Sequence, residues 1–531
     1  MSDQKKTYTS PKHKLLSFFE RSRDKWKAKS IEATATIKGL KNRIHFLEQS
    51  KLAWKEKAEQ RAAEVAELKA RLAEAARKLA EEEKEEAPET PPSTAMSLFE
   101  EHLPRHHYSP GEIVWFISLV TVAAVSLRGS AAAMAVSAQL LCPGLTMPSW
   151  SGGRLWLLRL GYYKLTRPKQ KADDWLWIVD HQVEGGQEKC LIILGLRLSN
   201  LPTERCLTHA DLEPIDIIPV THSDGKVVTQ QLKKSVRKTG APRVIVSDHG
   251  ADLKKGISDF CAQYPQTSFI YDIKHRTAAL LKKELNEEPR WQEFGRRMRQ
   301  TKQETQQTEL SYLAPPAQRT KARYMNADTV IGWGSRVLGL LDRLAEEGRL
   351  KKHARLWQKL GWVTGYRAEL SEWEGLLTTT RKTEKYVREK GYTRGCEKVL
   401  SEELPAQGLS PRVQAARNAL LEFVEEEGNK AREGERLPGS SEVLESVIGK
   451  LKRIEGAPRG RGMSNLLLSV GAIVATTTIE VVSQAMKKVR TKEVLAWSKK
   501  MLGKTQQAKR REAFSLSKTK EQKADQLPLI A

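Results

Sequence analysis

The chain has few cysteines and no long apolar run, and each shortage excludes a class of protein. Its five cysteines are widely spaced over 531 residues and form no CxxC pair. This excludes a disulfide framework and a thiolate zinc site and favours a reducing, cytoplasmic compartment. The basic N-terminus lacks the apolar core and cleavage site of a signal peptide. Two apolar stretches, 112–127 and 465–482, are too short or too polar to cross a bilayer, so we expect buried helices there and no membrane partner.

Acidic residues are also scarce relative to basic ones. The chain has 90 lysines and arginines against 65 aspartates and glutamates, a formal net charge of +25. Such an excess favours a polyanionic partner, because Lys and Arg release counterions when they neutralise phosphates. Nucleic acid is therefore the first partner class that we expect, and a merely soluble basic surface is the alternative.

The N-terminal third is predicted to be helical. Residues 31–85 carry a heptad pattern with Ile37 and Leu72 at a positions, which favours a self-dimerising coiled coil, although a single charged helix has the same composition. Residues 97–168 predict three helices, the third bearing Arg154 and Arg159. This arrangement suggests a helix-turn-helix-like DNA-binding region, and an ordinary three-helix bundle is the alternative.

Further along, strands and helices alternate. Strand-like runs at 175–183, 190–198, 214–220, 243–248 and 267–273 are separated by helical patterns in the order β-β-β-α-β-α-β. A mixed five-stranded sheet follows, in which the first and fourth strands are neighbours. The complete division is: basic segment 1–30, coiled coil 31–85, linker 86–96, helical region 97–168, α/β core 169–285, all-α insertion 286–435, second part of the core 436–502, and basic disordered tail 503–531.

Acids stand at the ends of the two neighbouring strands. Asp180 ends the first strand and Asp248 the fourth, so their carboxylates are expected to face each other. Close carboxylates repel unless a divalent cation holds them. A third acid is expected on a nearby helix, and we select Glu445, because Lys452 lies two turns further along the same face. Glu442, at the helix start, is assigned a capping role.

These acids and the strand order resemble a DDE-type insertion-sequence transposase. The spacing of Glu445 and Lys452 resembles the signature helix of that family, although the family's preceding Tyr and Arg fall here on Pro438 and Ser441. The segment YDIKH (271–275) resembles the C/D-x-x-H element of hAT and Mutator-like transposases, with Asp272 and His275 at its ends.

The resemblance implies an RNase H-like core with a helical insertion. It implies an enzyme that cuts terminal inverted repeats and joins them to target double-stranded DNA, with Asp180, Asp248 and Glu445 holding two Mg²⁺ ions (or Mn²⁺). Lys452 would contact a phosphate, and His275 and Asp272 would support the acids or handle DNA.

Two further expectations follow from the resemblance. Trp333 or Trp373 would stack on a displaced base or pack in the core. A bacterial-type, nucleoid-associated location is expected. The alternatives are a nuclease or domesticated relative on the same fold, and a non-catalytic DNA-binding coiled-coil protein.

Overall fold

The computed structural model describes residues 102–104, 106–141, 147–183, 188–203, 205–317, 324, 327–456, 463–504 and 506–515, with six isolated positions before residue 31. The predicted coiled coil at 31–85 and the linker at 86–96 lie outside these residues. The chain divides into two compact units. One comprises residues 1–92 and 307–312, and the other, 93–306 and 313–531, holds the sheet described below.

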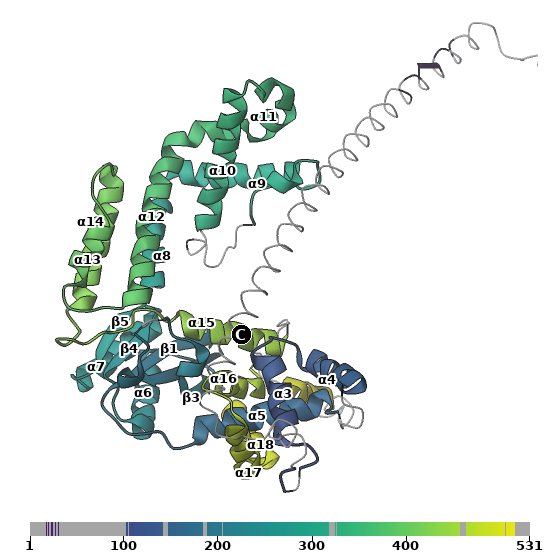
Figure 1. Ribbon diagram of the computed structural model, residues 1–531, viewed down its shortest axis with the longest axis vertical. Helices are drawn as coiled ribbons and strands as arrows, with labels where there is room; N and C mark the ends of the chain where they lie inside the picture. Colours follow the sequence, from purple (N-terminus) through teal and green to yellow (C-terminus); the bar gives the residue numbers. More distant parts are fainter. Residues whose placement is uncertain are drawn as a thin grey trace, which may run out of the picture. The chain divides into compact units, whose positions relative to one another are not determined.

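This second unit contains a mixed sheet in the order β3-β2-β1-β4-β5, with α6 (Gly225–Thr239) and α7 (Ala251–Gln263) beside it (Figure 1). Strand β1 pairs antiparallel with β2 and parallel with β4; β2–β3 is antiparallel and β4–β5 is parallel. The predicted five-stranded sheet and the adjacency of its first and fourth strands are confirmed. The strands are β1 (Trp175–Val183), β2 (Lys189–Arg197), β3 (Glu213–Val220), β4 (Val244–Ser247) and β5 (Ser268–Tyr271).

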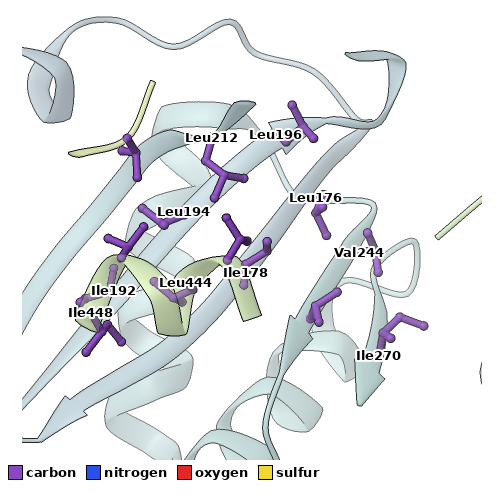
Figure 2. Packing of buried hydrophobic residues seen from close by; sticks show 14 of the residues in the cluster. Leu176, Ile178, Ile192, Leu194, Leu196, Leu212, Val244, Ile270, Leu444 and Ile448 are labelled. Carbon is purple, nitrogen blue, oxygen red and sulfur yellow. The ribbon is translucent and has the colours of Figure 1, made fainter. Parts of the chain in front are cut away.

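Alternation along the strands gives the sheet two buried faces. In β1, Trp177 packs in the cluster beneath α6 and α7, whereas Ile178 packs in the cluster on the opposite face. Successive side chains of a strand point to opposite faces of the sheet. Because both faces are buried, both alternating sets of side chains must be apolar. Figure 2 shows this second cluster, with Leu444 and Ile448 of α15 (Glu442–Glu455) against the strands.

The predicted helical region precedes the sheet, but its third helix is enclosed. The helices are α3 (Pro110–Thr121), α4 (Leu127–Leu141) and α5 (Trp150–Thr166). Helix α5 contributes Trp156 to one core cluster and Leu158 to another, so it is apolar around most of its circumference. A recognition helix needs one face free for the DNA groove. The position of α5 therefore does not fit the helix-turn-helix-like interpretation, and the three helices are part of the unit that contains the sheet.

Residues from the last part of the chain enclose α5. Helix α16 (Ser469–Ile473) contacts it backbone to backbone: a Cβ built on Gly471 would lie 2.5 Å from the Gly161 carbonyl oxygen. Helices α17 (Ile479–Lys488) and α18 (Thr491–Leu502) also contact α5. Helix α19 (Gln506–Ser515) lies where the disordered tail was predicted to begin. Among the described residues, no helix is long and apolar enough to cross a membrane.

The segment between β5 and α15 is helical, as predicted. Trp373 is fully buried and Trp333 is 5% exposed, within a cluster of aromatic rings that includes Phe294. Both tryptophans are therefore core residues, and base stacking by them is not supported. The helices are α8 (Ile273–Leu285), α9 (Pro289–Thr305), α10 (Ala327–Glu346), α11 (Ala354–Leu360), α12 (Arg367–Lys390), α13 (Cys396–Glu403) and α14 (Pro411–Gly428).

Candidate active site

The two aspartates lie at matching positions of two neighbouring strands. The parallel ladder between β1 and β4 ends with Val179 opposite Ser247, so Asp180 and Asp248 are the next residues on each side. Asp180 also shares its sheet face with Ile178, because side chains alternate along a strand. That is the face that α15 covers. The register of β1 and β4 therefore agrees with the predicted adjacency of the two aspartates.

Glu445 comes from α15, which packs on this same face. Leu444 and Ile448 lie in the core cluster beneath the sheet, and this contact fixes the rotation of the helix. Glu445, half-buried beside them, accepts hydrogen bonds at the edge of the cluster. Its charge makes a small contribution to the raised pKa of Asp180. Asp180 and Glu445, from distant parts of the chain, thus lie on the same side of the sheet.

Asp272 joins the two helices that surround this place. Its Oδ1 accepts the backbone N–H of His275 at 2.9 Å, which caps the first turn of α8. Its Oδ2 accepts the backbone N–H of Ser441 at 2.5 Å and the Ser441 hydroxyl at 2.9 Å, at the start of α15. The Asp-x-x-His spacing is thus that of an N-cap and the residue three positions later. Asp272 supports the acids by holding two helix ends, and no described contact joins it to them directly.

Two basic side chains of α8 contact Glu445. His275 Nε2 lies 3.2 Å from Oε1 of Glu445, and Lys274 Nζ donates to Oε2 at 3.1 Å. The hydrogen bond with His275 and the charge of Lys274 lower the pKa of Glu445 against the effect of burial. Burial disfavours the imidazolium form of His275, but its bond to Glu445 and the charges of Asp272 and Asp248 raise its pKa overall.

Asp180 is the carboxyl group with an unfavourable environment. Burial, followed by the charge of Asp248, raises the pKa of Asp180 to about 7, and Glu445 adds to the effect. The backbone N–H of His181, at 2.6 Å from Oδ1, opposes it. A half-buried carboxylate beside other acids is destabilised in its charged form, and a bound divalent cation would relieve this.

The donor types of this site fit a divalent cation, but the side chains are not gathered around one point. Carboxylate oxygens are the ligands that Mg²⁺ prefers. Within the described ranges, no three His, Cys, Asp or Glu side chains form a group that could hold a metal ion. Glu445 is bound to Lys274 and His275, and Asp248 Oδ1 accepts the Gly250 N–H at 3.1 Å. Metal binding would therefore require Glu445 to leave its two cationic partners.

The predicted DNA-contacting residues differ in their exposure and in their partners. Lys452 is exposed, two turns from Glu445 on α15. Arg159 instead donates to the carbonyl oxygens of Val489 and Met486 at 2.7 and 2.5 Å, at the end of α17. These contacts occupy most of its donors within the fold.

Arg154 is likewise turned inward. Its guanidinium donates to the side-chain oxygen of Asn465, and burial lowers its pKa. Both arginines thus have structural partners that are more than 300 residues away. The structure gives their predicted DNA contacts no support.

Sequence reasoning missed Lys274 and assigned Glu442 the wrong task. Glu442 does not cap α15; its carboxylate lies 3.2 Å from Arg388 and 3.9 Å from Lys274. Asp272 takes the capping role from 169 positions upstream. The position of Lys274, directly before the histidine of the Asp-x-x-His element, was the available signal for its role.

Comparisons with known proteins add little to this geometry. No protein-family model matches the chain, and no curated protein matches it. Among solved structures, it is similar to the Drosophila P element transposase strand transfer complex at a TM-score of 0.32 and 10% identity, covering 77% of this chain and 98% of that one. We therefore base the proposed function on the residues of the chain itself.

Proposed function

We propose that this chain is a DNA transposase of the DDE type, with an RNase H-like core that cuts transposon ends and joins them to target DNA. The proposal is supported by the positions of Asp180 and Asp248 just past a parallel strand pair, and of Glu445 on a helix that packs on the same sheet. Strand order 3-2-1-4-5, the parallel register of β1 and β4, and the docking of α15 give these positions.

The three acids would hold the divalent cations, two Mg²⁺ ions or Mn²⁺ in their place. When bound, such a pair supplies an activated water and charge stabilisation at the leaving oxygen of a phosphodiester. Asp180 would be the ligand most improved by the ion, because its carboxylate is the least stabilised without it.

The other residues of the site position Glu445 and the DNA. Asp272 keeps the starts of α8 and α15 together, so Lys274, His275 and Glu445 stay in register. Lys274 and His275 neutralise Glu445 before a cation arrives. Lys452, exposed on the same helix, would bind a backbone phosphate as a point charge.

A joining assay tests the function more sharply than a nuclease assay alone. Labelled duplexes from the DNA that flanks the gene, ending in a free 3′-OH, are incubated with supercoiled plasmid and the full chain in Mg²⁺ or Mn²⁺. We expect metal-dependent cleavage and covalent joining of label to plasmid. Asp180→Asn and Glu445→Gln should abolish both and leave duplex binding unchanged. Asp173→Asn, an exposed acid ahead of β1, is the matched control and should remain active.

The outcomes separate the alternatives. Cleavage without joining would assign a nuclease relative on the same fold. Binding with neither reaction would assign a non-catalytic DNA-binding protein, and activity that survives Asp180→Asn would refute the site.

A further inference from the structure

A pocket of about 480 Å³ lies beside the start of α15, outside the group of acids. Its walls come from three segments: residues 201–209 between β2 and β3, the end of α12, and residues 436–446. The volume is in the range of small-ligand sites and is large enough for one nucleotide. Nothing in the proposed chemistry at the acids uses it.

The lining combines an apolar wall with a cationic rim. The apolar part includes Leu201, Pro202, Leu207, Val387, Pro438 and Val443. Among the described residues that line the pocket, three are arginines and one, Glu442, is a carboxylate; Arg205 also pairs with Asp211 at 2.6 Å, outside the lining. An apolar surface beside guanidinium groups suits a base with its phosphate, because side chains can sandwich the base while Arg binds the anion.

Among the described residues, Arg436 has no acidic partner. Its four hydrogen bonds, at 2.8 to 3.3 Å, all go to backbone carbonyl oxygens, of Pro202, Thr203, Glu389 and Lys390. No ion pair involves it within the described part of the chain. The guanidinium therefore holds the pocket walls together and leaves a net positive charge at the pocket.

The pocket and the acids are separated by one turn of α15. Glu442 lines the pocket and lies 3.9 Å from Lys274 Nζ, while Glu445, on the next turn, is bound by that same Lys274. Three residues of an α-helix rise about 4.5 Å, against an axial rise of about 3.4 Å per nucleotide in one strand of duplex DNA. A strand held at the acids therefore has its neighbouring nucleotides within reach of the pocket.

We propose that this pocket binds one unpaired nucleotide of the DNA strand next to the scissile phosphate. The base lies against the apolar wall, and Arg388 and Arg436 face its phosphate. The proposal rests on the proposed function for the identity of the strand. Its ligand chemistry is that of a nucleotide, and a free nucleotide is the other source that the experiment must separate.

Cys206 provides a footprint that needs no mutation. It is an exposed free thiol on the pocket lining, whereas Cys261 lies outside the pocket and is partly buried. The full chain is alkylated with a maleimide in EDTA buffer, and labelling of each cysteine is followed by peptide mass mapping. A short single-stranded oligonucleotide should slow the labelling of Cys206 and leave Cys261 unchanged. A blunt duplex, the same oligonucleotide with abasic sites, and free deoxynucleoside monophosphate should protect much less.

Two variants distinguish binding from a structural salt bridge. Arg388 and Glu442 pair at 3.2 Å, so a purely structural role predicts similar losses when either is changed. Binding predicts opposite signs. Arg388→Gln should weaken single-strand affinity about tenfold through a lost charge-assisted contact. Glu442→Gln should keep or tighten it, and Lys385→Gln, an exposed charge on α12 outside the lining, should change it little.

Unchanged Cys206 labelling with every DNA would overturn the proposal, as would equal protection by blunt duplex or by abasic strand. If free nucleotide protected Cys206 as strongly as DNA does, the claim that the bound nucleotide belongs to a DNA strand would be overturned. Because the measurement is made without metal, the pocket can fail while cleavage succeeds, and the reverse.

Discussion

Asp272 and Ser441, 169 positions apart, are joined by two hydrogen bonds: the carboxylate accepts the Ser441 backbone N–H at 2.5 Å and its hydroxyl at 2.9 Å. The same carboxylate caps α8. A single buried side chain therefore sets the spacing between the helix that carries Glu445 and the helix whose Lys274 binds it.

Asp272→Ala should destabilise the fold more than the loss of an ordinary helix cap. It removes caps from two helices and empties a site that is 1% exposed. The expected loss in the free energy of unfolding is about 2–4 kcal/mol, against about 1 kcal/mol for one cap. Asp224→Ala, which caps only α6 through the Val227 N–H, is the matched control. Equal losses in urea unfolding of the two variants would contradict the double role.

The contribution of Asp180 to the stability of the metal-free protein should fall as pH rises from about 4 to 7, whereas His181 and His249, whose pKa values are lowered to about 4, contribute in the opposite direction. Folding raises the pKa of Asp180 from 3.8 to about 7, so the folded state keeps a proton that the unfolded chain has lost in this window. Stability falls wherever the folded state binds more protons, and the loss is complete above pH 7. Asp180→Asn should remove this slope and gain a few kcal/mol at pH 8. Thermal unfolding at pH 5 and pH 8 measures it; an identical pH slope in the variant would be inconsistent with the shift.

Removing Lys274 should tighten metal binding. Lys274 competes with a cation for Glu445, which it contacts at 3.1 Å. Lys274→Met should lower the Mn²⁺ concentration needed for thermal stabilisation by about two- to fivefold, the value of a partly exposed ion pair. A saturating ion, at about 100 times its Kd, adds about 2.7 kcal/mol in wild type. Lys282→Met, exposed on the same helix, should match wild type. Weaker binding in Lys274→Met would mean that Lys274 supports the site instead of competing with the ion.

Substitution of Arg159 should affect stability, whereas substitution of Lys452 should affect DNA binding. Arg159→Ala leaves carbonyl oxygens of α17 without their donor and should cost about 2–3 kcal/mol of stability, with no change in DNA affinity. Lys452→Ala should leave thermal unfolding unchanged and reduce the salt slope of DNA binding by about one. Fluorescence anisotropy at several salt concentrations, together with thermal unfolding, checks both. A reduced salt slope for Arg159→Ala would restore its predicted DNA contact.

Much of the sheet was predictable because its signals are local. Apolar runs ending in turn residues marked all five strands, and β1 spans the predicted 175–183. The order of strands and helices required parallel neighbours at β1 and β4, which brought Asp180 beside Asp248. Glu445 was selected from two candidates by its spacing to Lys452, and the structure places it on the helix that packs on the sheet face of Ile178, with Lys274 and His275 as its partners.

By itself, the sequence determined the strands and the positions of the aspartates at their ends, because these depend on residues a few positions apart. Only the tertiary structure decided that α5 is enclosed by α16, that Arg159 binds α17, that Asp272 joins α8 to α15, and that Lys274 holds Glu445. Each of these pairs lies more than 150 residues apart in the chain. Local preferences do not encode such contacts, because they form only when helices dock through apolar faces that fit many partners equally well.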